Sequence, residues 1–189
     1  DVNGDGIDSD DAGLLGTPFV VASEDGGDNF TYALDVYNAS TDSWMAYIMD
    51  MAISPEGDGI YNIALAGAAN AGIMPPMGTN SHLGTVFRLE AGTWLTGSWV
   101  DTRCYDGWDG SGEDPCTNGD WEIWSAAVVA VDFSPNFDMD DTIVCMSVAD
   151  INYMLPGGPY TPFLQEGTFN GGGAWNGEAG FSSPLQITN

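Results

Sequence analysis

Hydrophobic residues occur along the chain in short runs rather than at helical spacing. The runs are rich in β-branched and aromatic residues, and clusters of Gly, Pro, Asn, Asp and Ser bound them, which is typical of strands separated by turns. The pattern therefore predicts an all-β fold of antiparallel hairpins. The predicted strands are Pro18–Ala22, Phe30–Tyr37, Trp44–Ile53, Ile60–Ala66, Thr85–Leu89, Thr93–Val100, Glu122–Phe133 and Thr142–Val148, with Gln186 and Ile187 as candidates for a last strand.

Three long stretches interrupt the predicted strands: Asn70–Gly84, Asp101–Asp120 and Pro156–Gly173. Loops of this length in a compact domain usually carry function or are held by something other than secondary structure. The 189 residues suffice for one domain with a hydrophobic core. We therefore expect a single β-rich domain over residues 1–189, with a calcium loop at 1–12 and a repeat-derived β-sheet part at 13–189.

An internal repeat relates two segments of the chain. Met51–Ile63 and Val131–Val144 each contain an apolar strand, a Ser-Pro pair, an acidic turn and a second apolar strand. Ser54 and Ser134 are 80 residues apart, which would equal two units of about 40 residues, the size of a propeller blade. Chance similarity between two hairpins is the alternative. The fold prediction is accordingly either propeller-blade-like antiparallel hairpins or an open β-sandwich with long loops.

The charge of the chain excludes some partners. The chain has 28 acidic and 2 basic residues, for a net charge of −26. Binding to nucleic-acid phosphates requires clustered Lys and Arg, so nucleic acid is excluded as a partner. Because such charge repels itself in a compact state, bound cations or high salt must offset it. The 21 Asp outnumber the 7 Glu, and Asp favours turns, so the carboxylates are expected in loops, where calcium ligands lie.

The three cysteines indicate an oxidising compartment. Cys104 and Cys116 flank a loop rich in Gly and Asp, and we expect a disulfide between them, with two free thiols as the alternative. Cys145 lies in an apolar run and is expected to be a buried small hydrophobe. No apolar segment approaches the length of a membrane span, about 18–20 residues. The chain starts at Asp1 rather than Met, and we expect it to be a processed or excised piece.

The N-terminal residues form the sharpest candidate site. Side-chain oxygens of Asp1, Asn3 and Asp5 alternate along the chain, Gly6 permits a sharp turn, and Ile7 offers its backbone carbonyl. This segment resembles the calcium loop of EF-hands, and more closely that of dockerins and thrombospondin-type repeats. Position twelve is Ala12, where EF-hands have Glu, so Asp10 or Asp11 is expected to supply the last ligand. A solvated acidic terminus is the alternative.

Two further acidic segments are weaker calcium candidates. Asp106, Asp109, Glu113 and Asp114 are close in sequence and separated by Gly, but their spacing matches no standard loop. The turn with Asp138, Asp140 and Asp141 favours ordinary turn capping over metal binding.

The segment Ser23–Phe30 resembles an Asp-box, the hairpin turn of sialidase-like and sortilin-like β-propellers. Ser23, Asp25 and Gly27 match that motif, whereas Asn29 and Phe30 replace the usual Thr and Trp. The Ser-Pro repeats likewise resemble blades of bacterial surface proteins. In those families the box is a structural turn away from the active site, so the resemblance implies a fold rather than a chemistry.

The inventory of catalytic groups is poor. Sialidases bind the substrate carboxylate through three arginines, and this chain has only Arg88 and Arg103. A serine triad would depend on the single His82, and phosphoryl transfer lacks a P-loop and any Lys. Glycoside hydrolysis needs only two carboxylates, and Trp99, Trp108, Trp121 and Trp124 are candidates to stack on sugar rings or to pack under a loop.

We therefore predict an extracellular or cell-surface structural protein, not an enzyme. It would be a calcium-stabilised subunit of a surface layer, sheath or filament that assembles with identical subunits. The alternative is a secreted β-propeller domain that binds or cleaves carbohydrate, with glycans as partners. A salt-adapted secreted domain without an ion site is a third option.

Overall fold

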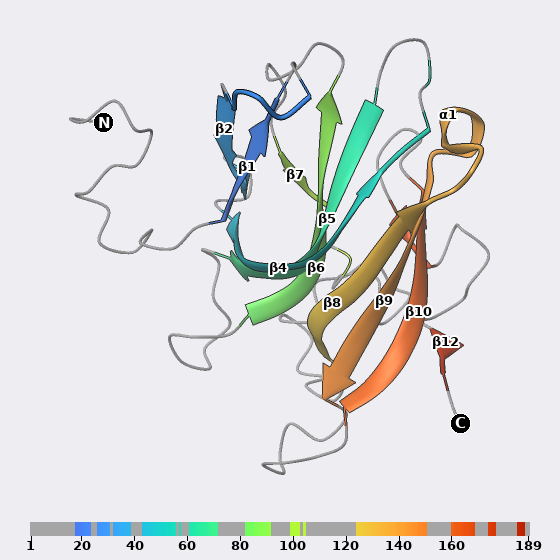
Figure 1. The fold of residues 1–189 in the computed structure, drawn as a ribbon. Helices are drawn as coiled ribbons and strands as arrows, with labels where there is room; N and C mark the ends of the chain where they lie inside the picture. The colour runs from blue at the N-terminus through green and yellow to red at the C-terminus, as the bar shows by residue number, and fades with distance from the viewer. Residues whose placement is uncertain are drawn as a thin grey trace.

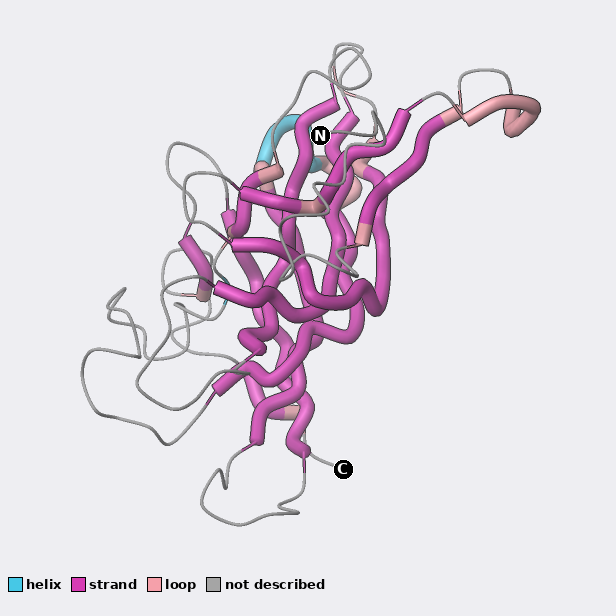
Figure 2. Tube along the Cα trace, turned by 90° about the vertical axis from the view of Figure 1, so that its left-hand side faces the viewer, coloured by secondary structure: helices cyan, strands magenta, loops and turns pink. Residues whose placement is uncertain are grey.

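The structure, a computed structural model, describes residues 18–23, 26–30, 32–38, 43–55, 57, 61–71, 82–91, 99–102, 104, 124–150, 160–168, 174–176 and 185–187. The elements in these parts are β1 (Phe19–Ala22), β2 (Tyr32–Asp35), β3 (Tyr37–Asn38), β4 (Ser43–Ile53), β5 (Tyr61–Ala71), β6 (His82–Ala91), β7 (Val100–Asp101), β8 (Trp124–Phe133), α1 (Phe137–Asp140), β9 (Thr142–Asp150), β10 (Tyr160–Thr168), β11 (Ala174–Trp175) and β12 (Leu185–Gln186). The predicted all-β class is confirmed, and Figure 2 shows strands almost throughout, with the short α1 at one end.

The strands form three antiparallel groups (Figure 1). β1 and β2 form a separate hairpin. The first sheet has the order β3-β4-β5-β6-β7, and the second has the order β11-β10-β9-β8 with β12 paired to β10. Each sheet is mainly a meander, in which strands that follow one another in the chain also pair side by side.

Most predicted strands are present with altered ends. β4, β8 and β9 begin or end within two residues of their predictions, whereas β5 and β6 extend into the predicted loop Asn70–Gly84. β10 is a correction, because its nine residues lie inside the stretch Pro156–Gly173 that was predicted to be irregular. Pro162, Gln165 and Gly167 are unfavourable for strands, and they obscured a strand that pairs with β9 over its whole length. The predicted strand Thr93–Val100 lies mostly outside the described residues.

The two segments of the internal repeat form equivalent hairpins in the structure, β4–β5 and β8–β9. Ile53 pairs with Ile63 in the first sheet, and Phe133 pairs with Ile143 in the second. Both hairpins also have two register irregularities at equivalent places, which are Met45/Tyr47 and Ile48/Asp50 in β4, and Ser125/Ala127 and Val128/Ala130 in β8. Each position in the β4–β5 hairpin thus has an equivalent 80 residues later in the β8–β9 hairpin. The repeating unit in the structure is therefore one meander of about 80 residues.

The Ser-Pro pairs end the first strand of each hairpin, as predicted. The Ser54 backbone N–H donates to Asn62 O at 2.8 Å, and the Asn62 N–H returns to Ser54 Oγ at 2.8 Å. In the second hairpin the Ser134 N–H donates to Thr142 O at 2.9 Å. The next residue is Pro in both hairpins, and Pro cannot continue a ladder because it has no N–H.

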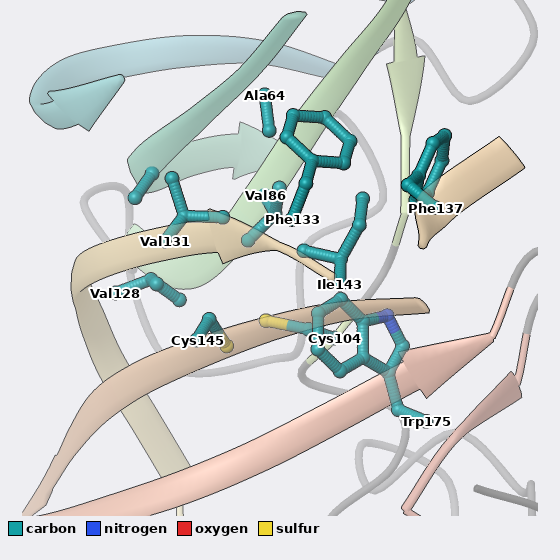
Figure 3. Close-up of a cluster of buried hydrophobic side chains, with 11 residues drawn as sticks. Ala64, Val86, Cys104, Val128, Val131, Phe133, Phe137, Ile143, Cys145 and Trp175 are labelled. Atoms are coloured by element: carbon teal, nitrogen blue, oxygen red, sulfur yellow. The ribbon is translucent and has the colours of Figure 1, made fainter. Parts of the chain in front are cut away.

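The two sheets pack face to face around the first cluster of buried side chains (Figure 3). β8 crosses the first sheet and contacts β4, β5 and β6. The first cluster contains Ala64, Ala66, Val86, Cys104, Val128, Val131, Phe133, Phe137, Ile143, Cys145 and Trp175. We call the face of the first sheet that carries Ala64 its packed face, and the opposite face its outer face. The second sheet likewise has a packed face with Ile143 and a back face with Val144.

The outer face of the first sheet carries a second buried cluster. Its members are Val36, Met45, Ile63, Leu65, Ala69, Phe87, Leu89 and Trp99. Val20 of β1 packs against this cluster. β5 and β6 are therefore buried on both faces, which explains their continuous small and apolar sequence.

We predict that Gly67→Ala destabilises the fold. A Cβ at Gly67 would overlap the carbonyl oxygen of Tyr47, because the irregular register of β4 brings its backbone close to β5. The equivalent position carries Ser147, so this close approach is particular to the first hairpin. We expect a loss of about 1–3 kcal/mol in the free energy of unfolding, measured by urea denaturation.

A matched control for this variant is Met139→Ala, since Met139 is 81% exposed on α1. The control should change the free energy of unfolding by less than about 0.5 kcal/mol. Equal stability of Gly67→Ala and the wild type would contradict the register of β4 against β5.

Candidate functional site

The predicted calcium ligands lie outside the described residues. These are Asp1, Asn3, Asp5, Ile7, Asp10 and Asp11 in the first loop, and Asp106, Asp109, Glu113 and Asp114 in the second. Within the part of the chain that the structure describes, no group of three or more His, Cys, Asp or Glu side chains is arranged to hold a metal ion. The calcium site therefore stays a prediction.

The acidic turn after β8 has the predicted capping role. Asp140 Oδ2 accepts a hydrogen bond from Ser134 Oγ at 2.6 Å, and Asp140 Oδ1 accepts one from the Thr142 N–H at 3.0 Å. Asp141 closes the short helix in the left-handed conformation, with φ of 48°. The Asp140 carboxylate thus connects the end of β8 to the start of β9.

The segment that resembles an Asp-box connects β1 to β2. Ser23 Oγ accepts a hydrogen bond from the Gly27 N–H at 2.8 Å, which closes a turn of the hairpin. Gly26 and Gly27 have positive φ values of 77° and 101°, a conformation that favours glycine. Asp25 lies outside the described residues, so the motif is described only at its serine and glycines.

A buried carboxylate connects three strands of the first sheet. Asp101 on β7 is 4% exposed, and its two oxygens accept hydrogen bonds from different hydroxyl groups. Ser43 Oγ of β4 donates at 3.0 Å, and Thr85 Oγ1 of β6 donates at 2.7 Å. With both oxygens engaged inside the protein, Asp101 stabilises the sheet rather than presenting a reactive group to solvent.

Cys104 and Cys145 are both free, buried thiols in the structure, so the predicted Cys104–Cys116 disulfide is not formed there, and neither is a bond between these two cysteines. Cys116 lies outside the described residues. Cys104 instead points into the first cluster, toward Cys145 of β9 (Figure 3). The sequence prediction placed Cys145 correctly as a buried residue, but it did not predict that Cys104 lies in the same cluster.

Trp99 and Trp175 are core residues. Trp99 is 2% exposed within the second cluster, which leaves no ring face for a sugar. Trp175 packs on Gly167, and its Nε1–H donates to Thr102 O at 2.9 Å, so it connects the second sheet to the end of β7. Trp108 and Trp121 lie outside the described residues, and the side chain of Trp124 is not described.

One end of the outer face is apolar and exposed. Met51 and Ile53 are 54% and 55% exposed, although they pair with the buried Leu65 and Ile63 and so lie on the same side of the sheet. Met49 beside them is 55% exposed. We call Met49, Met51 and Ile53 the β4 apolar patch. Such a patch on an otherwise acidic protein is suited to contact another protein.

Comparisons with protein-family models, with curated proteins and with solved structures give no match. The Asp-box and calcium-loop resemblances therefore stay predictions. Among the described residues, no helix has the length and hydrophobicity needed to cross a membrane.

We predict that Asp140→Ala lowers the free energy of unfolding by about 1 kcal/mol, because two turn hydrogen bonds are lost. Asp138→Ala is the matched control in the same exposed turn and should have a smaller effect. Urea denaturation with and without calcium chloride measures both variants. If calcium ions widen the difference between Asp140→Ala and the wild type, Asp140 is a metal ligand and the capping role is wrong.

Proposed function

We propose that this protein is an extracellular structural subunit that assembles head to tail with copies of itself, with calcium ions among its acidic loops. The observation that carries the proposal is the internal repeat, because one meander already packs on another within the chain. In the structure, the packed face of the second sheet covers the packed face of the first.

The stacking joins unlike faces of the repeating unit. By the shift of 80 residues, Val131 and Phe133 on the packed face of the second sheet are equivalent to Met51 and Ile53 on the outer face of the first. The same shift relates Ala64 and Ala66 of the packed face to Val144 and Met146 of the back face. Each meander therefore has two different faces. One is equivalent to the packed face of the second sheet, and the other is equivalent to the packed face of the first sheet.

Two faces carry exposed apolar residues within a single chain: the outer face of the first sheet and the back face of the second sheet. Val131 and Phe133 are 6% and 5% exposed, whereas their equivalents Met51 and Ile53 are more than half exposed. At the other end of the stack, Val144, Met146 and Val148 of the back face are partly exposed. The β4 apolar patch of one copy would then cover the back face of the next.

Contacts between unlike faces are heterologous, and they produce a ring when the rotation closes and a filament when it does not. Either product is a structural assembly of identical subunits. A surface layer, sheath or filament is thus the functional class that this arrangement supports best.

The net charge explains the proposed role of calcium. Copies with a charge of −26 repel one another, and Asp132 and Glu166 both pair with Val144 on the back face. Ion binding among the loop carboxylates would lower this repulsion, and calcium prefers the oxygen ligands that Asp supplies. The carbohydrate-binding alternative gains no support from Trp99 or Trp175, because both are buried.

We predict that Met51→Ser weakens self-association while Met139→Ser does not. Both methionines are exposed, at 54% and 81%, but only Met51 belongs to the β4 apolar patch. Burying a Met side chain contributes about 1.5–3 kcal/mol, so the dissociation constant should rise roughly tenfold or more. Sedimentation velocity over a concentration series, with electron microscopy of the products, measures the change. Equal association of the two variants would argue against this surface.

We predict that chelation of calcium lowers the melting temperature and dissolves the assembly. When the calcium concentration is one hundred times the dissociation constant of a site, binding stabilises the folded state by about 2.7 kcal/mol. Differential scanning calorimetry and light scattering in EDTA, followed by calcium addition, measure both effects. Sodium chloride and magnesium chloride at matched ionic strength separate charge screening from specific binding. Unchanged melting and unchanged scattering in EDTA would remove calcium from the proposal.

A further inference from the structure

Two cysteines from different sheets meet in the first cluster. Cys104 follows β7 of the first sheet and is 0% exposed, and Cys145 lies in the middle of β9 of the second sheet and is 2% exposed. Figure 3 shows the two sulfur atoms directed toward one another between the sheets. Two cysteines that face one another within one packed cluster are candidates for a disulfide.

The backbone around each cysteine is held in place. The Cys104 thiol donates to Gly84 O of the first sheet at 3.3 Å, and the neighbouring Thr102 is tied to Val86 O through its N–H at 2.9 Å. Cys145 pairs with Val131 on one side and Gln165 on the other. Cys145 is therefore oriented by ladders on both sides, and Cys104 is oriented by hydrogen bonds to the first sheet.

We propose that Cys104 and Cys145 form a disulfide that links the two sheets covalently, and that Cys116 remains a thiol. The two thiols lose two electrons and two protons, and a disulfide of a thiol–disulfide exchange partner accepts both. One thiolate attacks that disulfide, forms a mixed disulfide and releases one partner thiol. The second cysteine then attacks its neighbour's sulfur and releases the other partner thiol.

The surroundings of Cys104 determine whether its thiol reacts before or after the protein has folded. Burial raises the pKa of the Cys104 thiol well above its usual range, and the hydrogen bond with Cys145 and the nearby Asp101 carboxylate raise it further. Because the thiolate is the attacking species, reduced protein that is already folded should react slowly. Oxidation is therefore expected while the sheets close, and the finished bond should resist external reductants.

The test is oxidative refolding followed by disulfide mapping. Reduced full-length chain is refolded in oxidised and reduced glutathione, remaining thiols are alkylated, and a non-reducing chymotryptic digest is analysed by mass spectrometry. The expected result is a cross-linked peptide pair containing Cys104 and Cys145, with Cys116 alkylated. A bond from Cys116 to either other cysteine, or three alkylated cysteines, overturns the proposal.

Stability provides a second measurement. Cys116→Ser should retain the bond, and its oxidised form should melt roughly 5–15 °C above its reduced form. Cys104→Ala and Cys145→Ala, each combined with Cys116→Ser, cannot form it and should show no such difference. Equal melting of oxidised and reduced Cys116→Ser would contradict a stabilising link between the sheets. The wild-type peptide map decides the pairing even if a variant fails to fold.

Discussion

The packing of β8 across β4, β5 and β6 is the interaction on which the rest of this structure depends. Each large apolar side chain buried there contributes about 1.5–3 kcal/mol, and the chain has no comparable source of stability in ion pairs, with only 2 basic residues. The same packing brings Cys104 to Cys145 and Trp175 to Thr102. At the equivalent positions of the first sheet, Met51 and Ile53 remain more than half exposed.

The charge acts against this packing and so constrains how the protein can associate. Apolar contacts act only at close range, whereas repulsion between copies extends over a Debye length of about 8 Å at physiological ionic strength. An apolar patch on a chain of net charge −26 is thus effective only when cations reduce the repulsion. This combination would make the proposed assembly conditional on the ionic environment.

The sequence predicted the parts of the fold that local patterns control. The strands around Ser54 and Ser134, the turn capped by Asp140 and the burial of Cys145 follow from turn chemistry and short-range hydrophobicity. It missed β10, whose Pro162 and Gly167 are tolerated because tertiary pairing outweighs propensity. It also did not predict that Cys104 and Cys145 share one buried cluster, since proximity in sequence is visible and proximity across two sheets is not. The exposure of Met51 could not be predicted either. Met51 and its equivalent Val131 have similar sequence surroundings, and only the packing of the sheets buries Val131 and leaves Met51 exposed.

Differences between the two meanders show how one repeat acquired distinct roles. Leu65 fills its place in the second cluster, whereas the equivalent residue on the second sheet is Cys145. A leucine at position 145 would compete for the space that the Cys104 thiol occupies, so the smaller side chain is what admits Cys104 between the sheets. Cys104 itself lies after β7, outside the hairpin that the shift of 80 residues relates. The difference at position 145 thus places a contact with Cys104 where the first sheet has a leucine, while Met51 and Ile53 keep the apolar character of their buried equivalents Val131 and Phe133.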